Sequence, residues 1–369
     1  MYSFDVFDTL ITRTTAAPQG IFALMKEQLY KEQSVNKLDG YVVENFFELR
    51  IHSEELARRA GRYQGREEVT LYDIYKAMAV CGCLEEEQIR YLCQLEADTE
   101  IANVSGIEKN IHYLKGLLNR GEQVILISDM YLPVDTIEKM LLAVDEVFRG
   151  IPIYVSSEYG KRKTTGNLYR TVKELEQVDF EEWTHVGDNL FQDIEVPYQL
   201  GIRVELSSVT ELSEFEKKIL RDHGEDSRLQ LMVKTALRSI SQSESEGKAE
   251  TARCMGGRYA GPILYSYAEW IVEQAEKKGI KRLYFIARDG YLVKQIADII
   301  LKGRGTDITT KYIYGSRKAW RMQSLSEDHY NLYQLVLWSH TYRLQTLQEL
   351  ADFLRVPLQG LYEYLPGVY

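Results

Sequence analysis

The chain has 369 residues, 45% of them hydrophobic, and carries a net charge of −10 at pH 7. The length is enough for two domains, the apolar share is typical of a globular protein, and the acidic balance argues against a nucleic-acid partner. No apolar run reaches the length of a membrane span, and the first residues lack the basic flank and apolar core of a secretory signal, so we expect a cytoplasmic protein with no membrane span.

The first predicted element is a short strand over residues 2–4. After it, four helices are predicted with hardly a strand between them. They begin after Pro18, near residue 41, after a capping pair formed by Thr70 and Asp73, and near residue 84. We interpret residues 13–105 as a helical bundle that is inserted after the first strand.

From residue 106 the pattern changes to strands that alternate with helices. The sequence predicts strands over about residues 124–128, 151–155, 184–188 and 203–206. This alternation is typical of a parallel sheet that helices cover on both faces. Residues 1–12 and 106–212 are therefore expected to form one α/β core with a Rossmann-like parallel sheet.

Polar residues follow four of the predicted strands. They are Asp5, Asp8 and Thr9; Ser128 and Asp129; Lys161 and Lys163; and Asp188, Asn189 and Asp193. Because parallel strands bring their carboxyl ends to one edge of a sheet, we expect these groups to form one site. A carboxylate there could attack phosphorus, further carboxylates could hold Mg²⁺, and a lysine with a hydroxyl could bind phosphoryl oxygens.

The motifs around these residues resemble those of the haloacid-dehalogenase-like (HAD) hydrolase superfamily over about residues 1–212. The matching stretches are DVFDTL, VILISD, GKRKTTGNLY, and GDN followed by an aspartate. The resemblance implies a hydrolase in which the inserted helices act as a cap that closes over the site and selects the substrate.

The same resemblance implies a nucleophile and a metal site. Asp5 would be the nucleophile, with Thr9 four residues after it as the motif requires. Mg²⁺ would be bound by Asp5, Asp188 and the main-chain carbonyl of Phe7. Asp193 would assist, either directly or through a water molecule.

The resemblance also implies residues that bind the transferred group. Ser128, at the end of the second strand of the core, would bind it together with Lys163. Lys161 is the second candidate for the lysine of this motif. Asp129 is a further candidate for substrate binding, and Asn189 is expected to help position its loop.

Phe7 stands where most phosphatases of this superfamily have a second aspartate, which protonates the leaving group. Asp8 is one residue further on, so it is a candidate for the missing acid. Three interpretations stay open. The protein is a phosphatase that uses Asp8, a cap residue or an easily expelled leaving group; or it does chemistry that needs no such acid, as dehalogenases and phosphonatases do; or it has lost turnover and binds a ligand.

Beyond the core, residues 213–254 are predicted to form a helical connection with a serine-rich linker near 239–251. Residues 255–369 are expected to form a second, smaller α/β domain, because a strand–helix–strand pattern begins near residue 281. Such a pattern would bring polar side chains to one edge, as a candidate second site for a phosphate or a carboxylate. These side chains are Arg288, Asp289, Ser316 and Arg317.

The order of motifs along nearly the whole chain resembles multidomain HAD-like proteins that accompany bacterial surface-polysaccharide and glycosyltransferase systems. This resemblance implies a sugar-phosphate or other small phosphorylated substrate, and a glycosyltransferase or polysaccharide-assembly partner. From the sequence we predict a Mg²⁺-dependent phosphatase that works through an aspartyl-phosphate. The alternative is a catalytically weak or inactive scaffold that binds a ligand in such a system.

Overall fold

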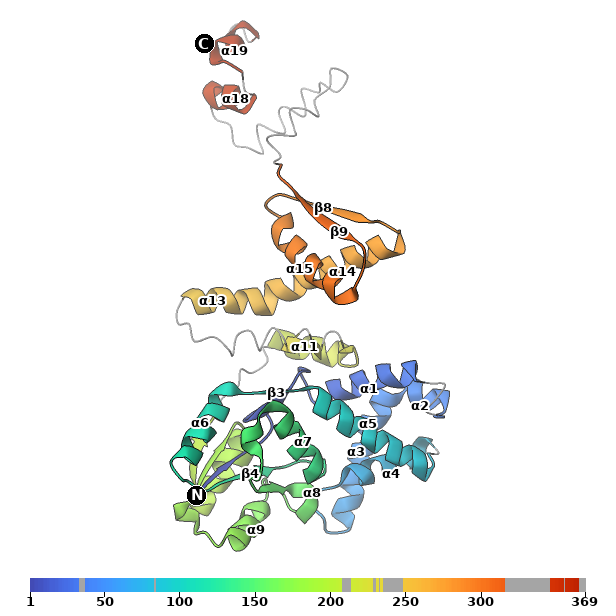
Figure 1. The fold of residues 1–369 in the computed structure, drawn as a ribbon, viewed down its shortest axis with the longest axis vertical. Coiled ribbons are helices and arrows are strands. Elements are labelled where there is room, and N and C mark those ends of the chain that lie inside the picture. Colours follow the sequence, from blue (N-terminus) through green and yellow to red (C-terminus); the bar gives the residue numbers. More distant parts are fainter. Residues whose placement is uncertain are drawn as a thin grey trace. The chain divides into compact units, whose positions relative to one another are not determined.

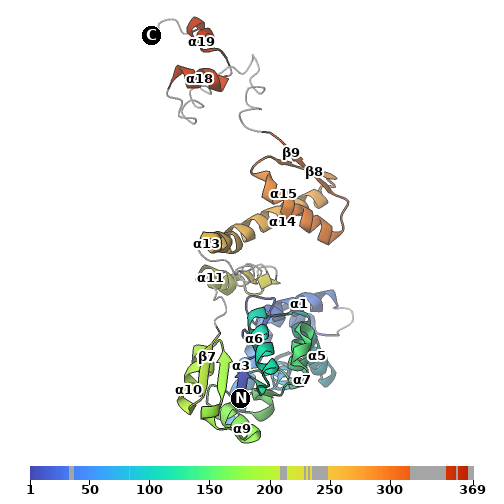
Figure 2. The ribbon, with the colours of Figure 1, turned by 60° about the vertical axis from the view of Figure 1, so that its left-hand side comes forward.

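The computed structural model describes residues 1–32, 37–82, 84–207, 214–227, 230–231, 233–234, 248–315, 346–354 and 356–364. The chain divides into two compact units, Met1–Pro262 and Ile263–Tyr369, and each is described by itself (Figures 1 and 2). Among the described helices, none has both the length and the apolar character that crossing a membrane requires.

A five-stranded sheet forms the centre of the first unit. Its strands are β1 (Tyr2–Phe4), β4 (Val124–Ser128), β5 (Ile153–Val155), β6 (Thr184–Gly187) and β7 (Arg203–Leu206). They lie in the order β5-β4-β1-β6-β7, and every neighbouring pair is parallel. The Rossmann-like parallel sheet predicted from the sequence is therefore confirmed, and β1 is its central strand.

Helices cover both faces of this sheet. On one face, Val124 and Leu126 belong to the same apolar cluster as residues of α6 (Glu108–Asn119) and α7 (Val134–Val144). On the other face, Ile125 and Ile127 pack with residues of α9 (Asn167–Glu176). Every residue of β4 is buried, which explains why its first four residues are all apolar rather than alternating.

Short helical turns complete the α/β core. They are Glu146–Phe148 and Phe180–Glu182, both 3-10; α8 (Ser156–Tyr159); the π-helical η3 (Leu190–Glu195); and α10 (Val196–Leu200). Residues 190–200 are thus helical, and the first part of this stretch is a π-helix. π-helical turns occur often at functional sites.

Among the described residues of the insertion between β1 and the rest of the core, five helices are present. They are α1 (Gly20–Lys31), α2 (Gly40–Glu44), α3 (Phe46–Tyr63), α4 (Leu71–Gly82) and α5 (Glu86–Ala102). The helix that was expected to begin near residue 41 is divided into two, α2 and α3, at Asn45. Thr70 and Asp73 form the predicted capping pair, because each accepts the other's main-chain N–H at 3.1 Å.

The chain enters and leaves the insertion through a two-stranded antiparallel ribbon, which was not expected from the sequence. In this ribbon β2 (Ile11–Arg13) pairs with β3 (Val104–Gly106). Strands of three residues contain too little alternation to be recognised in a sequence. The expected ends of the insertion, residues 13 and 105, lie within the ribbon.

The insertion and the α/β core share one apolar cluster. Residues of all five inserted helices belong to the same cluster as β1, α6 and α7, and α5 packs against α7.

The insertion also buries the charged side chain of Arg50. Arg50 forms ion pairs with Glu96 at 2.7 Å and with Glu54 at 3.1 Å, and its guanidinium lies over the ring of Phe22.

The segment after β7 contains α11 (Glu214–His223) and α13 (Lys248–Met255), which a π-helical turn (Gly256–Ala260) follows. Between α11 and α13, Gln230 accepts the N–H of Ala16 at its main-chain carbonyl and the N–H of Ala17 at its side chain. The segment therefore returns to the start of the insertion. Of the expected serine-rich linker, residues 248–251 belong to α13, and residues 239–247 lie outside the described part of the chain.

The second unit is smaller. Its elements are α14 (Gly261–Lys277), β8 (Arg282–Ile286), α15 (Gly290–Arg304), β9 (Thr309–Ile313), α18 (Leu347–Leu354) and α19 (Leu358–Tyr364). β8 and β9 pair in parallel, as the strand–helix–strand pattern predicts. Residues of α14, β8 and α15 form a separate apolar core.

Candidate active site at the carboxyl end of the central strand

Asp5 directly follows β1, and its main-chain N–H donates to the carbonyl of Val186 in β6 at 2.8 Å. The backbone that carries this carboxyl is therefore fixed by the sheet. The side chain is buried. Burial raises the pKa of Asp5 well above its usual value; the charge of Lys163 opposes this rise, and the charges of Asp193 and Asp188 add to it.

Asp8 lies in a sharp turn after β1. The carbonyl of Val6 accepts the main-chain N–H of Leu10 at 2.9 Å, and Asp8 has a φ of 58°, a left-handed conformation that aspartate adopts more readily than most residues. Its Oδ1 accepts a hydrogen bond from the Thr12 hydroxyl at 2.5 Å and lies 3.9 Å from Nζ of Lys234. The carboxylate of Asp8 thus contacts the base of the insertion.

Phe7 also contacts the base of the insertion. The guanidinium carbon of Arg13 lies 4.5 Å from the centre of the Phe7 ring. Arg13 in turn forms a two-pronged ion pair with Glu100 of α5, with N–O distances of 2.8 to 3.1 Å. The ring occupies the position at which the sequence resemblance implies an acid, and it has no proton to donate.

Three carboxylates converge at the ends of β1 and β6. Asp188 directly follows β6, and Asp193 lies in η3. One oxygen of each of Asp5, Asp188 and Asp193 lies within 4.8 Å of the others. Burial, together with the charges of Asp8 and Asp193, raises the pKa of Asp188 to about 6. The hydroxyl of Thr9 lies 3.5 Å from Oδ1 of Asp188.

The local backbone brings Asp193 close to the end of β6. A Cβ atom at Gly187 would lie 2.4 Å from Cβ of Asp193, so glycine is required for this approach. Asn189 caps η3, because its Oδ1 accepts the main-chain N–H groups of Phe191 and Gln192 at 3.0 and 3.1 Å. The N–H of Asn189 itself donates to Oδ2 of Asp193 at 3.1 Å.

Lys163 is fully buried and faces two of the carboxylates. Its ammonium donates to Oδ1 of Asp5 and, at 2.6 Å, to Oδ1 of Asp193. Burial alone would lower the pKa of Lys163, but the charges of Asp193 and Asp5 outweigh it and raise this pKa. The site therefore contains an ammonium that orients Asp5 and balances part of the negative charge.

A buried chain of hydrogen bonds runs from Trp183 through Ser3 and His185 to Asp193. Oγ of Ser3 accepts from Nε1 of Trp183 at 2.6 Å and lies 2.7 Å from Nδ1 of His185. The carboxylate of Asp193 can only accept, so Nε2 of His185 carries the proton and donates to it at 3.3 Å. In a neutral ring Nδ1 then accepts from the Ser3 hydroxyl. Burial lowers the pKa of His185, in agreement with a neutral ring. Burial acts to raise the pKa of Asp193, but Lys163 and His185 hold it below its usual range.

Ser128 lies at the same edge of the sheet. It is the last residue of β4, and Leu126, two residues earlier, pairs with Phe4 of β1. The register thus places Ser128 next to the chain that follows β1. The side chain of Ser128 is buried.

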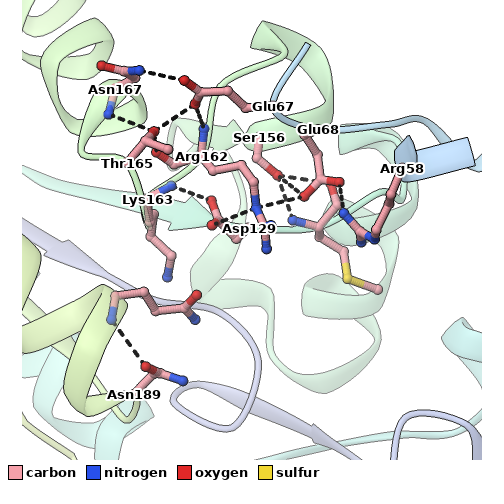
Figure 3. Close-up of polar contacts among 12 residues, drawn as sticks. Arg58, Glu67, Glu68, Asp129, Ser156, Arg162, Lys163, Thr165, Asn167 and Asn189 are labelled. Atoms are coloured by element: carbon pink, nitrogen blue, oxygen red, sulfur yellow. Dashed lines mark hydrogen bonds and ion pairs between the residues drawn. The ribbon is translucent and has the colours of Figure 1, made fainter. Parts of the chain in front are cut away.

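The two other substrate-binding candidates lie differently. Oδ1 of Asp129 accepts the main-chain N–H of Lys163 at 2.7 Å, so this carboxylate contacts the loop that carries the lysine (Figure 3). Nζ of Lys161 donates to the hydroxyl of Thr171 in α9 at 2.9 Å. Of the two candidate lysines, Lys163 is the one that contacts Asp5.

The candidate second site belongs to the second unit. Arg288 and Asp289 stand between β8 and α15, both are exposed, and they form an ion pair with each other at 3.4 Å. Ser316 and Arg317 lie outside the described residues. The four residues therefore stay a prediction.

Two residues near the site were not expected from the sequence. Lys234 donates to the hydroxyl of Thr12 at 2.6 Å and approaches Asp8. Glu67, from the connection between α3 and α4, accepts the main-chain N–H of Arg162 at 2.9 Å, next to Lys163 (Figure 3). Both contacts join residues far apart in the chain, and neither residue lies in a motif, so no local signal marks them.

No family model matches the sequence, and no curated protein matches it. Among solved structures, a 2-haloacid dehalogenase from Pseudomonas syringae pv. Tomato DC3000 is 17% identical, over 58% of this chain and 88% of that one, with a TM-score of 0.40. A HAD-family enzyme from Bacteroides thetaiotaomicron, in complex with magnesium and inorganic phosphate, is 15% identical, over 58% and 96% of the two chains, with a TM-score of 0.36.

A HAD phosphatase from Thermococcus onnurineus is 15% identical, over 58% of this chain and 88% of that one, with a TM-score of 0.34. All three similarities are distant, and they concern the fold. By their names, these three solved structures are a 2-haloacid dehalogenase and two HAD-family enzymes.

Proposed function

We propose that the first unit is a Mg²⁺-dependent phosphatase that acts on a small phosphorylated substrate through an aspartyl-phosphate at Asp5. The observation that supports this proposal is the convergence of Asp5, Asp188, Asp193 and Lys163 at the end of the central strand. Sugar phosphates are the substrate class suggested by the resemblance to proteins of polysaccharide systems. A glycosyltransferase or another polysaccharide-assembly protein is the partner that the same resemblance suggests.

The residues at the site fit Mg²⁺. Asp5, Asp188 and Asp193 offer carboxylate oxygens, which this ion prefers, and the main-chain carbonyl of Phe7 is a further candidate ligand. Three carboxylates around one ammonium leave an excess of negative charge, which a divalent cation would offset. When bound, Mg²⁺ would neutralise charge on the phosphoryl oxygens.

Asp5 would act as the nucleophile. One oxygen of its carboxylate would form a bond to phosphorus while the bond from phosphorus to the leaving oxygen breaks. A water molecule would then attack the same phosphorus, which releases inorganic phosphate and restores the carboxylate. Lys163 would orient Asp5 and, with Ser128, bind the phosphoryl oxygens.

The leaving group would receive no proton from Phe7. Substrates whose leaving group departs as a stable anion, such as p-nitrophenyl phosphate, should therefore react faster than alkyl phosphates. Asp8 is the nearest alternative acid in the sequence, and its carboxylate is hydrogen-bonded to Thr12.

A second candidate function is binding of a phosphorylated ligand without turnover. The observation that favours it is the packing of Phe7 against Arg13, which replaces an acid with an apolar contact. Lys163 and the carboxylates with a bound cation would still provide a phosphate-binding pocket. In this case the protein would be a scaffold or sensor in a glycan-assembly system.

Phosphate release separates the two candidates. The full chain is incubated with Mg²⁺ and with sugar phosphates, nucleotides and p-nitrophenyl phosphate. We expect turnover that falls to background in Asp5→Asn, because the amide cannot attack phosphorus. Asp179→Asn is the matched control, since Asp179 is exposed and pairs with Lys173 on the surface.

Two outcomes would contradict the phosphatase. Activity retained in Asp5→Asn would show that Asp5 is not the nucleophile. No turnover of any substrate, with inorganic phosphate still bound in calorimetry in the presence of Mg²⁺, would support the ligand-binding candidate.

A further inference from the structure

The loop that carries Lys163 connects α8 to α9. Gly160 and Gly166, at its two ends, have φ of 61° and 75°, left-handed values that glycine adopts without strain. Between them, the loop's own main-chain hydrogen bonds include one from the N–H of Gly166 to the carbonyl of Lys163 at 2.8 Å. The conformation of this loop determines where the buried ammonium of Lys163 lies.

Two carboxylates from outside the loop accept consecutive main-chain N–H groups at its centre. The N–H of Lys163 donates to Asp129 at 2.7 Å, and the N–H of Arg162 donates to Glu67 at 2.9 Å. Asp129 directly follows β4 of the α/β core, whereas Glu67 belongs to the insertion (Figure 3). The loop between α8 and α9 that carries Lys163, called the lysine loop below, is therefore held by one residue of the core and one residue of the insertion.

Glu67 makes further contacts along the same loop and at the start of α9. Its carboxylate also accepts from the hydroxyl of Thr165 at 2.7 Å and from Nδ2 of Asn167 at 2.5 Å. In the reverse direction, its own N–H donates to the carbonyl of Gly160 at 3.1 Å. Burial acts to raise the pKa of Glu67, but the hydrogen bonds from Thr165, Arg162 and Asn167 outweigh it and lower this pKa. Glu67 is thus ionised at neutral pH, and its bonds are charge-assisted.

Glu68, the next residue, fixes the orientation of the connection that carries Glu67. Its side chain is buried, and it contacts Arg58 of α3 and the hydroxyl of Ser156. Nε of Arg162 lies 3.4 Å from Oε2 of the same carboxylate. Glu67 and Glu68 therefore face the lysine loop together, as Figure 3 shows.

From these contacts we propose that Glu67 is a positioning residue for Lys163, so that the ammonium reaches Asp5 only when the insertion is seated on the core. This inference rests on the proposed function, in which Lys163 orients Asp5 and binds the phosphoryl group. Under this proposal the insertion covers the site and also helps to position one of its residues, Lys163. A cap that moved away would remove Glu67 from the loop and so release the lysine.

Loss of Glu67 should lower turnover more than it weakens substrate binding. A shift of about 1 Å in a catalytic group costs up to about 10²-fold in rate. We therefore expect Glu67→Ala to lower kcat for p-nitrophenyl phosphate with Mg²⁺ by about 10- to 100-fold, with a smaller change in KM. Glu67→Gln keeps a carbonyl acceptor, so its kcat should fall less than that of Glu67→Ala. Glu55→Ala is the matched control, because Glu55 lies on α3 and pairs only with solvent-exposed Arg59 among the described contacts.

A double variant tests whether Glu67 acts through Lys163. Lys163→Ala and Glu67→Ala/Lys163→Ala should have the same residual rate, since a positioning residue has no effect once its target is gone. A further drop in the double variant would overturn the proposal, because Glu67 would then act independently of the lysine.

A readout that needs no turnover separates this proposal from the proposed function. Acetylation of Lys163 by an amine reagent, followed by mass spectrometry of the full chain, should be slow in the wild type and in Glu55→Ala, since the ammonium is buried. Glu67→Ala removes the carboxylate that accepts from Arg162, Thr165 and Asn167, so it should speed acetylation by about 10-fold or more. Glu67→Gln should speed it to a smaller extent. Faster acetylation without phosphatase activity in the wild type would uphold the positioning role and reject the phosphatase. Unchanged acetylation in both Glu67 variants would reject the positioning role, whatever the activity.

Discussion

Phe7 is the residue of the candidate site whose packing bears most directly on the proposed activity. It stands two residues after Asp5, and its ring packs on the guanidinium of Arg13. Arg13 is itself bound to Glu100, so the aromatic ring joins the turn after β1 to helix α5 of the insertion. The position at which the proposed phosphatase would need a proton donor thus has a structural role.

Restoring an acid at this position should change leaving-group dependence. In Phe7→Asp we expect faster hydrolysis of alkyl phosphates, by up to the 10²- to 10⁴-fold typical of general acid catalysis, and little change for p-nitrophenyl phosphate. Steady-state rates on both substrates measure this. Phe7→Leu is the control, as it removes the ring without adding an acid. Equal effects of Phe7→Asp on the two substrates would show that the missing acid is not what limits the rate.

Cys93 offers a test of burial inside the insertion. Burial raises its pKa to about 12, and the charge of Glu96 adds to the rise. At pH 8 about one Cys93 thiol in 10⁴ is then ionised, and the thiolate is the reactive form. Iodoacetamide should therefore modify exposed Cys81 long before Cys93. Peptide mass spectrometry measures both rates, and equal rates would mean that α5 is not packed as described.

At the scale of elements, the strands of the core could be predicted because β4 begins as a buried apolar run and because polar motifs follow both β4 and β6. The edge of a parallel sheet then brought Asp5, Ser128 and Asp188 to one region. The motif favoured Lys163 over Lys161, but it could not show which of the two contacts Asp5, because both stand in the same loop and only its folded conformation separates them. Glu67 could not be found at all, since its contact with Arg162 depends on how the insertion packs.

The helical insertion contains a buried ion pair whose loss should be severe. Removing one partner in Arg50→Ala leaves Glu96 charged and buried, which costs about 3–5 kcal/mol. Tyr75 donates to the same carboxylate at 2.5 Å, so some hydrogen bonding remains. Urea unfolding should show this cost as a lower free energy of unfolding in Arg50→Ala than in the wild type.

The comparison variant is Arg50→Met/Glu96→Leu, which removes both charges at similar volume. It should be more stable than Arg50→Ala, because no buried charge is left unpaired. If Arg50→Ala unfolded at the same urea concentration as the wild type, the pair would contribute nothing to the stability of the insertion.

At the scale of the whole molecule, the acidic site should link metal binding to stability. A cation that binds only the folded chain raises the free energy of unfolding by RT ln(1 + [L]/Kd), about 2.7 kcal/mol at a hundredfold excess over Kd. We expect the melting temperature to rise with Mg²⁺ in the wild type and not in Asp188→Asn. Without metal, Asp188→Asn should melt higher than the wild type, because one of three crowded carboxylates has lost its charge. A wild-type melting temperature that does not change when Mg²⁺ is added would contradict the metal site.

The β2–β3 ribbon has a consequence for how such a protein could diversify. Paired strands lie about 4.8 Å apart, so the two ends of the inserted helices start and finish next to each other on the core. Because its two ends are neighbours, the inserted segment can be replaced by one of another length without moving the strands of the core sheet. Any replacement would, however, have to bring its own carboxylate to the lysine loop, and recombination would therefore favour donors in which that one acidic side chain is kept.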